Sequence, residues 1–227
     1  MTHWRASIGL RPPRTAVCLA HLMFCPSTKK FFLYGLAVAG LEEFITQGVL
    51  KGSYFSWVFT LIPFVVFLGI AGCARAVLHK LVKGWRAAAL YHAVTGGIGL
   101  AVEWFIIGLS PWSDRSSPCL LIALFQASVF SFWGTVALAP HILLDARPEI
   151  APLQRRLRWT LAVMMSVTYV LTFAAKAVGA LQGTQFLASI GPVVITFLTM
   201  NVFYIQYFRT CGRSTPLVPR GPTSPRT

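Results

Sequence analysis

Long apolar runs separated by short polar segments make up most of the chain. Six runs are close to the length that crosses a membrane, at 31–50, 54–74, 86–109, 118–144, 160–181 and 184–207. An α-helix needs about 20 apolar residues to span the ~30 Å hydrocarbon core of a bilayer, and within lipid it satisfies its own backbone hydrogen bonds. The pattern therefore predicts an all-α, polytopic integral membrane protein, folded as a six-transmembrane-helix bundle.

The segments outside these runs are too short to fold by themselves. We expect a basic cytoplasmic N-terminal segment over 1–30, a transmembrane domain over 31–208 and a disordered cytoplasmic tail, rich in Pro, Ser and Thr, over 209–227. The apolar stretch 16–25 does not look like a secretory signal, because Pro26 and Lys29-Lys30 follow it where a small-residue cleavage site is required.

The composition supports a membrane protein and the charge predicts its orientation. Only 11% of the 227 residues are charged, compared with about 25% in an average globular protein. Seventeen of the 20 Lys and Arg residues lie in the head, the second and fourth connections and the tail, whereas the opposite side carries Lys51 and Arg115. Because positive loops stay in the cytoplasm, both termini are predicted to be cytoplasmic, N-in and C-in, in a plasma or inner cell membrane. The net charge of +14 then reflects topology and contact with anionic lipid on the cytoplasmic face, rather than binding of nucleic acid.

Three of the six acidic residues, Glu42, Glu43 and Glu103, lie inside predicted spans. A charge in the middle of a bilayer costs about 2.5–3.5 kcal/mol on insertion scales, so ionisable residues there are functional candidates. At 1.5 Å per residue, Glu43, Glu103 and the intramembrane Lys176 all come to the outer half of the membrane. Gln126 comes to the same level, which predicts a polar layer open to the extracytoplasmic side.

Helical spacing predicts that these groups face protein rather than lipid. In the third span one stripe, spaced by 4, 3 and 4 residues, joins small residues to a histidine and a carboxylate: His92, Gly96, Gly99 and Glu103. In the first span a similar stripe, spaced by 4, leads from small residues to Glu43 and Gln47. Glu42 points about 100° away from that stripe, toward the side of Thr46.

Spans one and three also resemble each other locally. Each has a Glu, two large apolar residues within the next three positions, and a Gly five residues after the Glu, at 43–48 and at 103–108. This resemblance is compatible with a duplicated helical hairpin.

Two interpretations of the intramembrane charges remain open. In the functional one, the carboxylates outnumber Lys176 and bind a cation, a proton or an amine, with the site lined by Glu42, Glu43, Gln47, Glu103, Gln126 and Lys176. In the structural one, Lys176 neutralises one Glu and the group only fixes helix register. A polar path further into the membrane would use His92, Tyr169 and Asn201, although a packing role is the alternative for His92.

Several chemistries are excluded because their motifs are missing. The chain has no Walker A, GxSxG or HExxH sequence and no CxxC pair, so neither a metal site nor a cofactor is predicted, and no catalytic residue is identified. A haem held by His92 and His141 is the weakest alternative that we considered.

The leading expectation is a small integral-membrane transporter, or the membrane-embedded substrate-binding component of one, for a cation, a proton-coupled solute or a small amine. Glu43 and Glu103 would bind or relay the charge. The first alternative is a membrane enzyme acting on a lipid or isoprenoid, with a Glu as general acid or base, so enzymatic activity is left open. The second is a non-catalytic assembly subunit. The expected partners are the bilayer and a small ligand or ion, with a second copy or another membrane subunit as further candidates.

Overall fold

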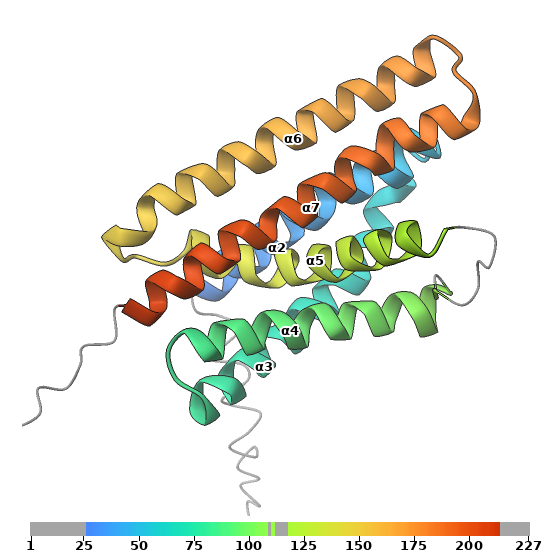
Figure 1. Cartoon of the computed structure of the whole chain (residues 1–227). Coiled ribbons are helices and arrows are strands. Elements are labelled where there is room, and N and C mark those ends of the chain that lie inside the picture. Colours follow the sequence, from blue (N-terminus) through green and yellow to red (C-terminus); the bar gives the residue numbers. More distant parts are fainter. Residues whose placement is uncertain (1–25, 109, 112–117, 214–227) are drawn as a thin grey trace, which may run out of the picture.

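The computed structural model describes residues 26–108, 110–111 and 118–213 (Figure 1). These residues form helices, with no strand in the described ranges. The α-helices are α2 (Pro26–Glu43), α3 (Ile62–Leu81), α4 (Trp85–Val102), α5 (Cys119–Leu143), α6 (Ala151–Ala177) and α7 (Gln182–Arg213). Short helices of other types complete the fold: the π-helices η1 (Phe44–Leu50) and η3 (Glu103–Ile107) and the 3₁₀-helices η2 (Ser56–Leu61) and η4 (Pro148–Ile150).

Five stretches of helix in the described ranges are long and apolar enough to cross a membrane, namely Ser56–Leu81, Trp85–Ile107, Cys119–Leu143, Pro148–Ala177 and Gln182–Gly212. The predicted all-α class is confirmed, and five such helices indicate a multi-pass membrane protein. The first predicted span corresponds to α2 and η1 together. That stretch is not among the five, and it carries Lys29 and Lys30 at its start and Glu42 and Glu43 in its middle.

Helix α5 forms the centre of the bundle. It packs against α2, α4 and α7, and every residue from Ser131 to Pro140 is buried. Small side chains in this stretch let neighbouring helices approach closely. Gly134, for example, lies directly under the His92 ring of α4. Helix α6 packs against α7 on the side away from α4 (Figure 1).

Large apolar side chains cover much of the outer surface. Val66 on α3, Val170 on α6 and Ile195 on α7 are each more than half exposed. In water such a surface would be unfavourable, whereas in lipid it is the expected exterior of a membrane bundle. The exposed face of the helices is therefore the lipid-facing one.

Two helices extend beyond the predicted spans. Helix α6 begins at Ala151, nine residues before the predicted start at 160, and so includes Arg155, Arg156 and Arg158. Helix α7 continues to Arg213, past position 208, the predicted end of the transmembrane domain. Arg is a good helix former, and its long side chain lets the charge reach water while the backbone stays helical. Residues 1–25 and 214–227, which hold most of the two predicted terminal segments, lie outside the described residues.

Candidate functional site

Glu43 and Glu103 occupy matching places in the backbone. Helix α2 ends at Glu43, and the π-helix η1 begins at the next residue. Helix α4 ends at Val102, and the π-helix η3 begins with Glu103 itself. Single π-helical turns are rare and occur frequently at functional sites. The local resemblance between the two segments in sequence thus extends to an α-to-π transition at each glutamate.

The indole of Trp133 on α5 holds the Glu103 carboxylate. Trp133 Nε1 donates a hydrogen bond to Glu103 Oε1 over 3.1 Å. The ring fits against α4 because residue 99 is glycine: a Cβ there would come within 2.0 Å of the Trp133 side chain. Phe64 and Phe67 of α3 pack on the other side of the indole, each with its ring centroid 4.7 Å away. The Trp133 ring is therefore held in place by packing contacts in addition to its hydrogen bond with Glu103.

Glu43 has a different environment. The hydroxyl of Thr60, from η2, interacts favourably with this carboxylate, although its own hydrogen is donated to the Trp57 carbonyl oxygen. The Glu43 oxygen Oε2 is buried with no hydrogen-bond partner among the described residues. Buried polar atoms without a partner are uncommon and costly. This oxygen is therefore available to a proton or a cationic ligand.

The structure brings three glutamates, Glu42, Glu43 and Glu103, into electrostatic range of one another, and we call this group the acidic layer. The charge of Glu42 interacts with those of Glu43 and Glu103, and the charge of Glu43 interacts with that of Glu103. Lys51 is the cation whose charge reaches Glu42 and Glu43. In the described part of the chain, the single ion pair within 4 Å is Arg147–Asp145, which lies elsewhere. The carboxylates of this layer therefore make no direct ion pair there.

Aromatic and amide side chains frame the acidic layer. Phe44, next to Glu43, packs edge-on against Trp57 at 5.3 Å and stacks with Tyr169 of α6 at 5.9 Å. Trp104, next to Glu103, donates from Nε1 to Gln126 Oε1 over 2.6 Å. Gln126 is thus at the level predicted for it and contacts the neighbour of a predicted site residue.

Lys176 lies close to the layer but contacts backbone. Its ammonium group donates to the carbonyl oxygen of Val49, in the last turn of η1. The pairing of Lys176 with a glutamate, which the structural interpretation required, is not formed. Gln47, also in η1, is half-buried. Its backbone carbonyl oxygen accepts a hydrogen bond from the Ser53 backbone amide over 3.0 Å.

The predicted polar path is formed in part. His92 Nε2 and Asn201 Oδ1 are 3.3 Å apart, and Asn201 Nδ2 donates to Ser131 Oγ over 2.7 Å. The expected contact between His92 and Asn201 is therefore confirmed. Tyr169 does not join them, because α6 packs against α7 and η1, where Tyr169 stacks with Phe44.

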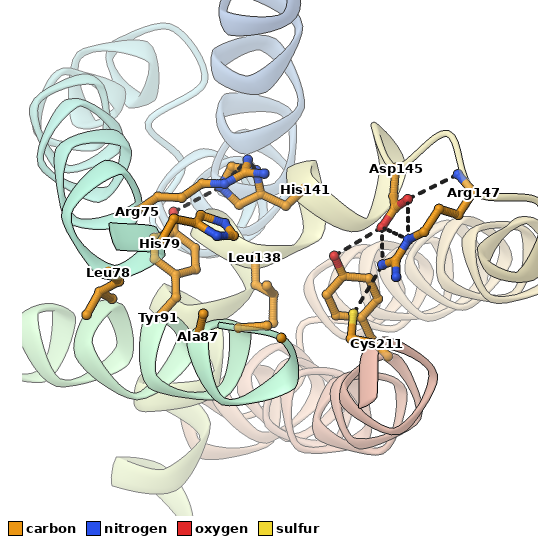
Figure 2. A pocket seen from close by; sticks show the side chains of 13 residues that line it. Arg75, Leu78, His79, Ala87, Tyr91, Leu138, His141, Asp145, Arg147 and Cys211 are labelled. Atoms are coloured by element: carbon orange, nitrogen blue, oxygen red, sulfur yellow. Dashed lines mark hydrogen bonds and ion pairs between the residues drawn. The ribbon is translucent and has the colours of Figure 1, made fainter. Parts of the chain in front are cut away.

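A second polar region, which the sequence did not single out, lies at the opposite end of α4. It is a cavity of about 280 Å³ between α3, α4, α5 and α7 (Figure 2). Its basic side chains are Arg75, His79, His141 and Arg147, and its one acidic side chain is Asp145. These residues come from separate segments of the chain, and Lys and Arg are ordinary at cytoplasmic helix ends, so no sequence signal distinguished them.

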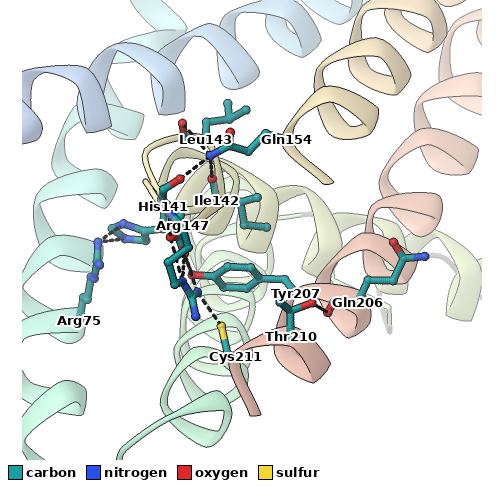
Figure 3. A network of polar contacts seen from close by, with 11 residues as sticks. Arg75, His141, Ile142, Leu143, Arg147, Gln154, Gln206, Tyr207, Thr210 and Cys211 are labelled. Atoms are coloured by element: carbon teal, nitrogen blue, oxygen red, sulfur yellow. Dashed lines mark hydrogen bonds and ion pairs between the residues drawn. The ribbon is translucent and has the colours of Figure 1, made fainter. Parts of the chain in front are cut away.

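Asp145 anchors one side of this cavity. Arg147 donates to both of its carboxylate oxygens, from Nε over 3.0 and 3.1 Å and from Nη2 over 2.6 Å, and Tyr207 donates to Oδ2 over 3.2 Å. Burial acts to raise the pKa of Asp145, but the hydrogen bonds and charge of Arg147 outweigh it and leave this pKa below its ordinary value. Gln154 holds the turn by donating to the carbonyl oxygens of Ile142 and Asp145 over 2.8 and 2.7 Å (Figure 3).

No three His, Cys, Asp or Glu side chains within 26–108, 110–111 and 118–213 gather in a way that would hold a metal ion. The five apolar helices indicate a multi-pass membrane protein, and the glutamates of the acidic layer are half-buried within it. The chain matches no known protein-family model, no curated protein and no solved structure.

Proposed function

We propose that this protein is a small membrane transporter, or the membrane-embedded binding component of one, that handles a proton or a small protonated amine through Glu43 and Glu103. One observation carries the proposal. Two glutamates at matching α-to-π transitions interact electrostatically, have no ion-pair partner in the described part of the chain, and leave Glu43 Oε2 buried and unpartnered. Binding of a proton or a cation stabilises a carboxylate that is removed from water and has no ion-pair partner.

The chemistry of such a site follows from the cost of charge in an apolar layer. Two carboxylates close together cannot both stay ionised without compensation, so they take up a proton or a cation between them. Trp133 donates a hydrogen bond that favours an ionised Glu103 carboxylate, which lets the charge be released again. The aromatic rings of Phe44 and Trp57 offer faces to an organic cation.

The proposal includes six spans with both termini in the cytoplasm. Helix α2 and η1 together cover 25 residues, 18 in α2 and seven in η1, a length of roughly 35 Å that is sufficient to cross a bilayer. Helix α2 packs against the central α5, as a spanning helix would. An even number of spans returns the chain to its starting side, in agreement with the bias of Lys and Arg toward alternate connections.

Labelling of single cysteines tests this topology. In a chain freed of its native cysteines, we expect Lys29→Cys and Ala146→Cys to react with a membrane-impermeant maleimide only after the membrane is opened. Tyr54→Cys should react in intact cells. Equal protection of positions 29 and 54 would show that residues 26–50 do not cross the membrane.

Proton flux into liposomes tests the function. The purified full chain is reconstituted around a trapped pH-sensitive dye, and flux is measured under an imposed potential, without solute and with small amines such as methylamine. We expect Glu43→Gln and Glu103→Gln to lower the flux at least about tenfold, the change that corresponds to losing roughly 1.4 kcal/mol of binding.

The matched control is Glu149→Gln, which removes the same charge from an exposed site in η4 and should leave flux unchanged. Each variant is first shown to have the elution volume and melting temperature of the wild type. Undiminished flux in well-folded Glu43→Gln and Glu103→Gln proteins would remove the glutamates from the transport path.

A further inference from the structure

The cavity at the start of α4 has the form of a small binding site. Its volume of about 280 Å³ is near the lower end of the range for small-molecule pockets, about 300–1,000 Å³. Figure 2 shows its side chains in two groups. Arg75, His79 and His141 gather on one side, and the Asp145–Arg147 pair with Cys211 lies on the other.

The charge in the cavity is unbalanced. Asp145 is its single acidic lining residue, and both of its oxygens are already bound by Arg147. Arg75 contacts the His141 ring instead of a carboxylate, and His141 Nε2 lies 3.3 Å from the Tyr91 hydroxyl. A guanidinium beside an imidazole at the wall of a cavity is suited to an anion that both can contact.

The backbone adds to this positive potential. Helix α4 begins at Trp85, just after Gly84, and Gly84, Ala87 and Ala88 line the cavity. The first turn has no acidic residue and no side-chain cap. The Ala87 amide already donates to the Gly84 carbonyl oxygen over 3.2 Å, so the free N–H groups are those at the very start of the helix. The N-terminus of a helix carries a partial positive charge and free amide donors, which favour phosphate. Glycine and alanine at the lining positions let a ligand come close to the backbone.

The surroundings indicate where the anion comes from. Exposed apolar side chains border the cavity end of α3 and α4, with Val77 55%, Leu81 73% and Trp85 47% exposed. Lys80 lies in the same stretch of chain. An apolar surface beside a basic pocket at a helix end matches a phospholipid, whose acyl chains lie along the helices while its phosphate meets the cations.

We propose that this pocket binds a phosphate group, supplied by the headgroup of an anionic phospholipid on the cytoplasmic side of the membrane. Arg75 and His79 contact the phosphate oxygens, and the N-terminus of α4 donates backbone hydrogen bonds. The site is separate from the acidic layer, since it lies at the opposite end of α4 and includes none of Glu42, Glu43 and Glu103. The same chemistry also fits a soluble phosphate ester, so the experiment has an arm for each source.

The experiment uses the purified full chain in detergent. One arm counts retained phosphatidylglycerol and phosphatidylcholine molecules by native mass spectrometry. The other measures the melting temperature with inorganic phosphate and with glycerol 3-phosphate. Wild type is compared with Arg75→Gln, with His79→Gln and with a matched control, Lys83→Gln, which removes an exposed cation of the same region that does not line the cavity.

We expect wild type and Lys83→Gln to retain phosphatidylglycerol in preference to phosphatidylcholine, and Arg75→Gln to bind it about tenfold more weakly. Stabilisation by glycerol 3-phosphate that depends on Arg75 would support the phosphate site and assign it to a soluble ester. If Arg75→Gln does not fold, the exposed His79→Gln carries the same test. Equal weakening by Lys83→Gln and by the pocket variants, or no preference for phosphatidylglycerol in the wild type, would overturn the proposal.

Discussion

The acidic layer at one end of α4 and the basic pocket at the other differ in how their charges are compensated. Glu103 receives an indole hydrogen bond and Glu43 keeps a buried oxygen without a hydrogen-bond partner, and neither has an ion-pair partner in the described chain. In the pocket, Asp145 forms a two-point pair with Arg147, and Arg75 with two histidines faces the cavity.

The free-energy cost of a charge differs between the two regions because of where each region lies. A carboxylate in the middle of apolar helices is costly, so its presence there is itself evidence of a role. A cation at a helix end costs little, because its long side chain reaches the interface. Only the cavity and the missing counter-charge indicate that Arg75 and its neighbours bind something. The following predictions test this contrast, in order of decreasing effect.

The tightest packing in the acidic layer is between Gly99 and Trp133. Gly99→Ala places a methyl group within 2.0 Å of the indole and must displace it, and with it the hydrogen bond to Glu103. We expect a loss of about 3 kcal/mol, at the upper end of the cost of overpacking. Thermal and denaturant unfolding in detergent measure it. The control is Gly97→Ala on the same helix, where a Cβ meets nothing within 4 Å and stability should hold. Equal effects at both positions would show that the contact with Trp133 is not tight.

The indole hydrogen bond is the next largest contribution. Trp133→Phe keeps an aromatic ring against Phe64 but removes the donor to Glu103. We expect a loss of about 1.5 kcal/mol, typical of a hydrogen bond to a charged group. In a Glu103→Gln background the loss should be smaller, since the two residues share one interaction. Unfolding of the four proteins of this cycle measures it, with the exposed Trp159→Phe as control. Strictly additive losses would mean that the charge of Glu103 adds nothing to this hydrogen bond.

The ion pair of the basic pocket should make stability depend on pH. The folded-state pKa of Asp145 is below its ordinary value, so its stabilisation is present above about pH 4 and is lost as pH falls through the folded-state pKa. Asp145→Asn should therefore cost about 1 kcal/mol at pH 7, the range for partly exposed ion pairs, and less as the pH approaches 3. Melting temperatures across this range, with Glu149→Gln as control, measure the difference. A difference that stays constant with pH would contradict the assignment.

Between the two charged regions the bundle is joined by neutral hydrogen bonds. Tyr204 donates to Thr135 Oγ1 over 2.6 Å, and Thr135 in turn donates to the Ser131 carbonyl oxygen over 2.6 Å. Tyr204→Phe removes one donor and leaves Thr135 bonded, so we expect a loss of about 0.5 kcal/mol. Tyr169→Phe, at a partly exposed tyrosine, is the control in unfolding measurements. A loss as large as that of Trp133→Phe would mean that neutral and charge-assisted contacts contribute equally here.

Some contacts of the site could be predicted from helical spacing and others could not. The stripe from His92 to Glu103 was visible in the sequence, and the hydrogen bond between His92 and Asn201 was expected and is confirmed. The partners of Tyr169 and Lys176 could not be predicted, because spacing shows which residues share a face but not which helix that face meets. Here α6 meets α7 and η1, which places Tyr169 on Phe44 and Lys176 on the Val49 carbonyl oxygen.

The π-helical turns could not be predicted from helical spacing either. An extra residue in a turn leaves the apolar spacing of a short segment almost unchanged, so η1 and η3 had no distinct signature beyond the similar residues at 43–48 and 103–108. The basic pocket was missed for another reason. Arg75, His141 and Cys211 belong to three distant segments of the chain and meet only when α3, α4, α5 and α7 converge.

The sequence by itself determined the class of protein, its helices and the presence of acidic residues inside them, because apolar length and the cost of buried charge are local properties of a chain. The tertiary structure alone decided which partner each polar group found: Trp133 for Glu103, a backbone carbonyl for Lys176, and the walls of the basic pocket. Those choices depend on which helix faces pack together, and packing is settled by the shapes of side chains far apart in the chain.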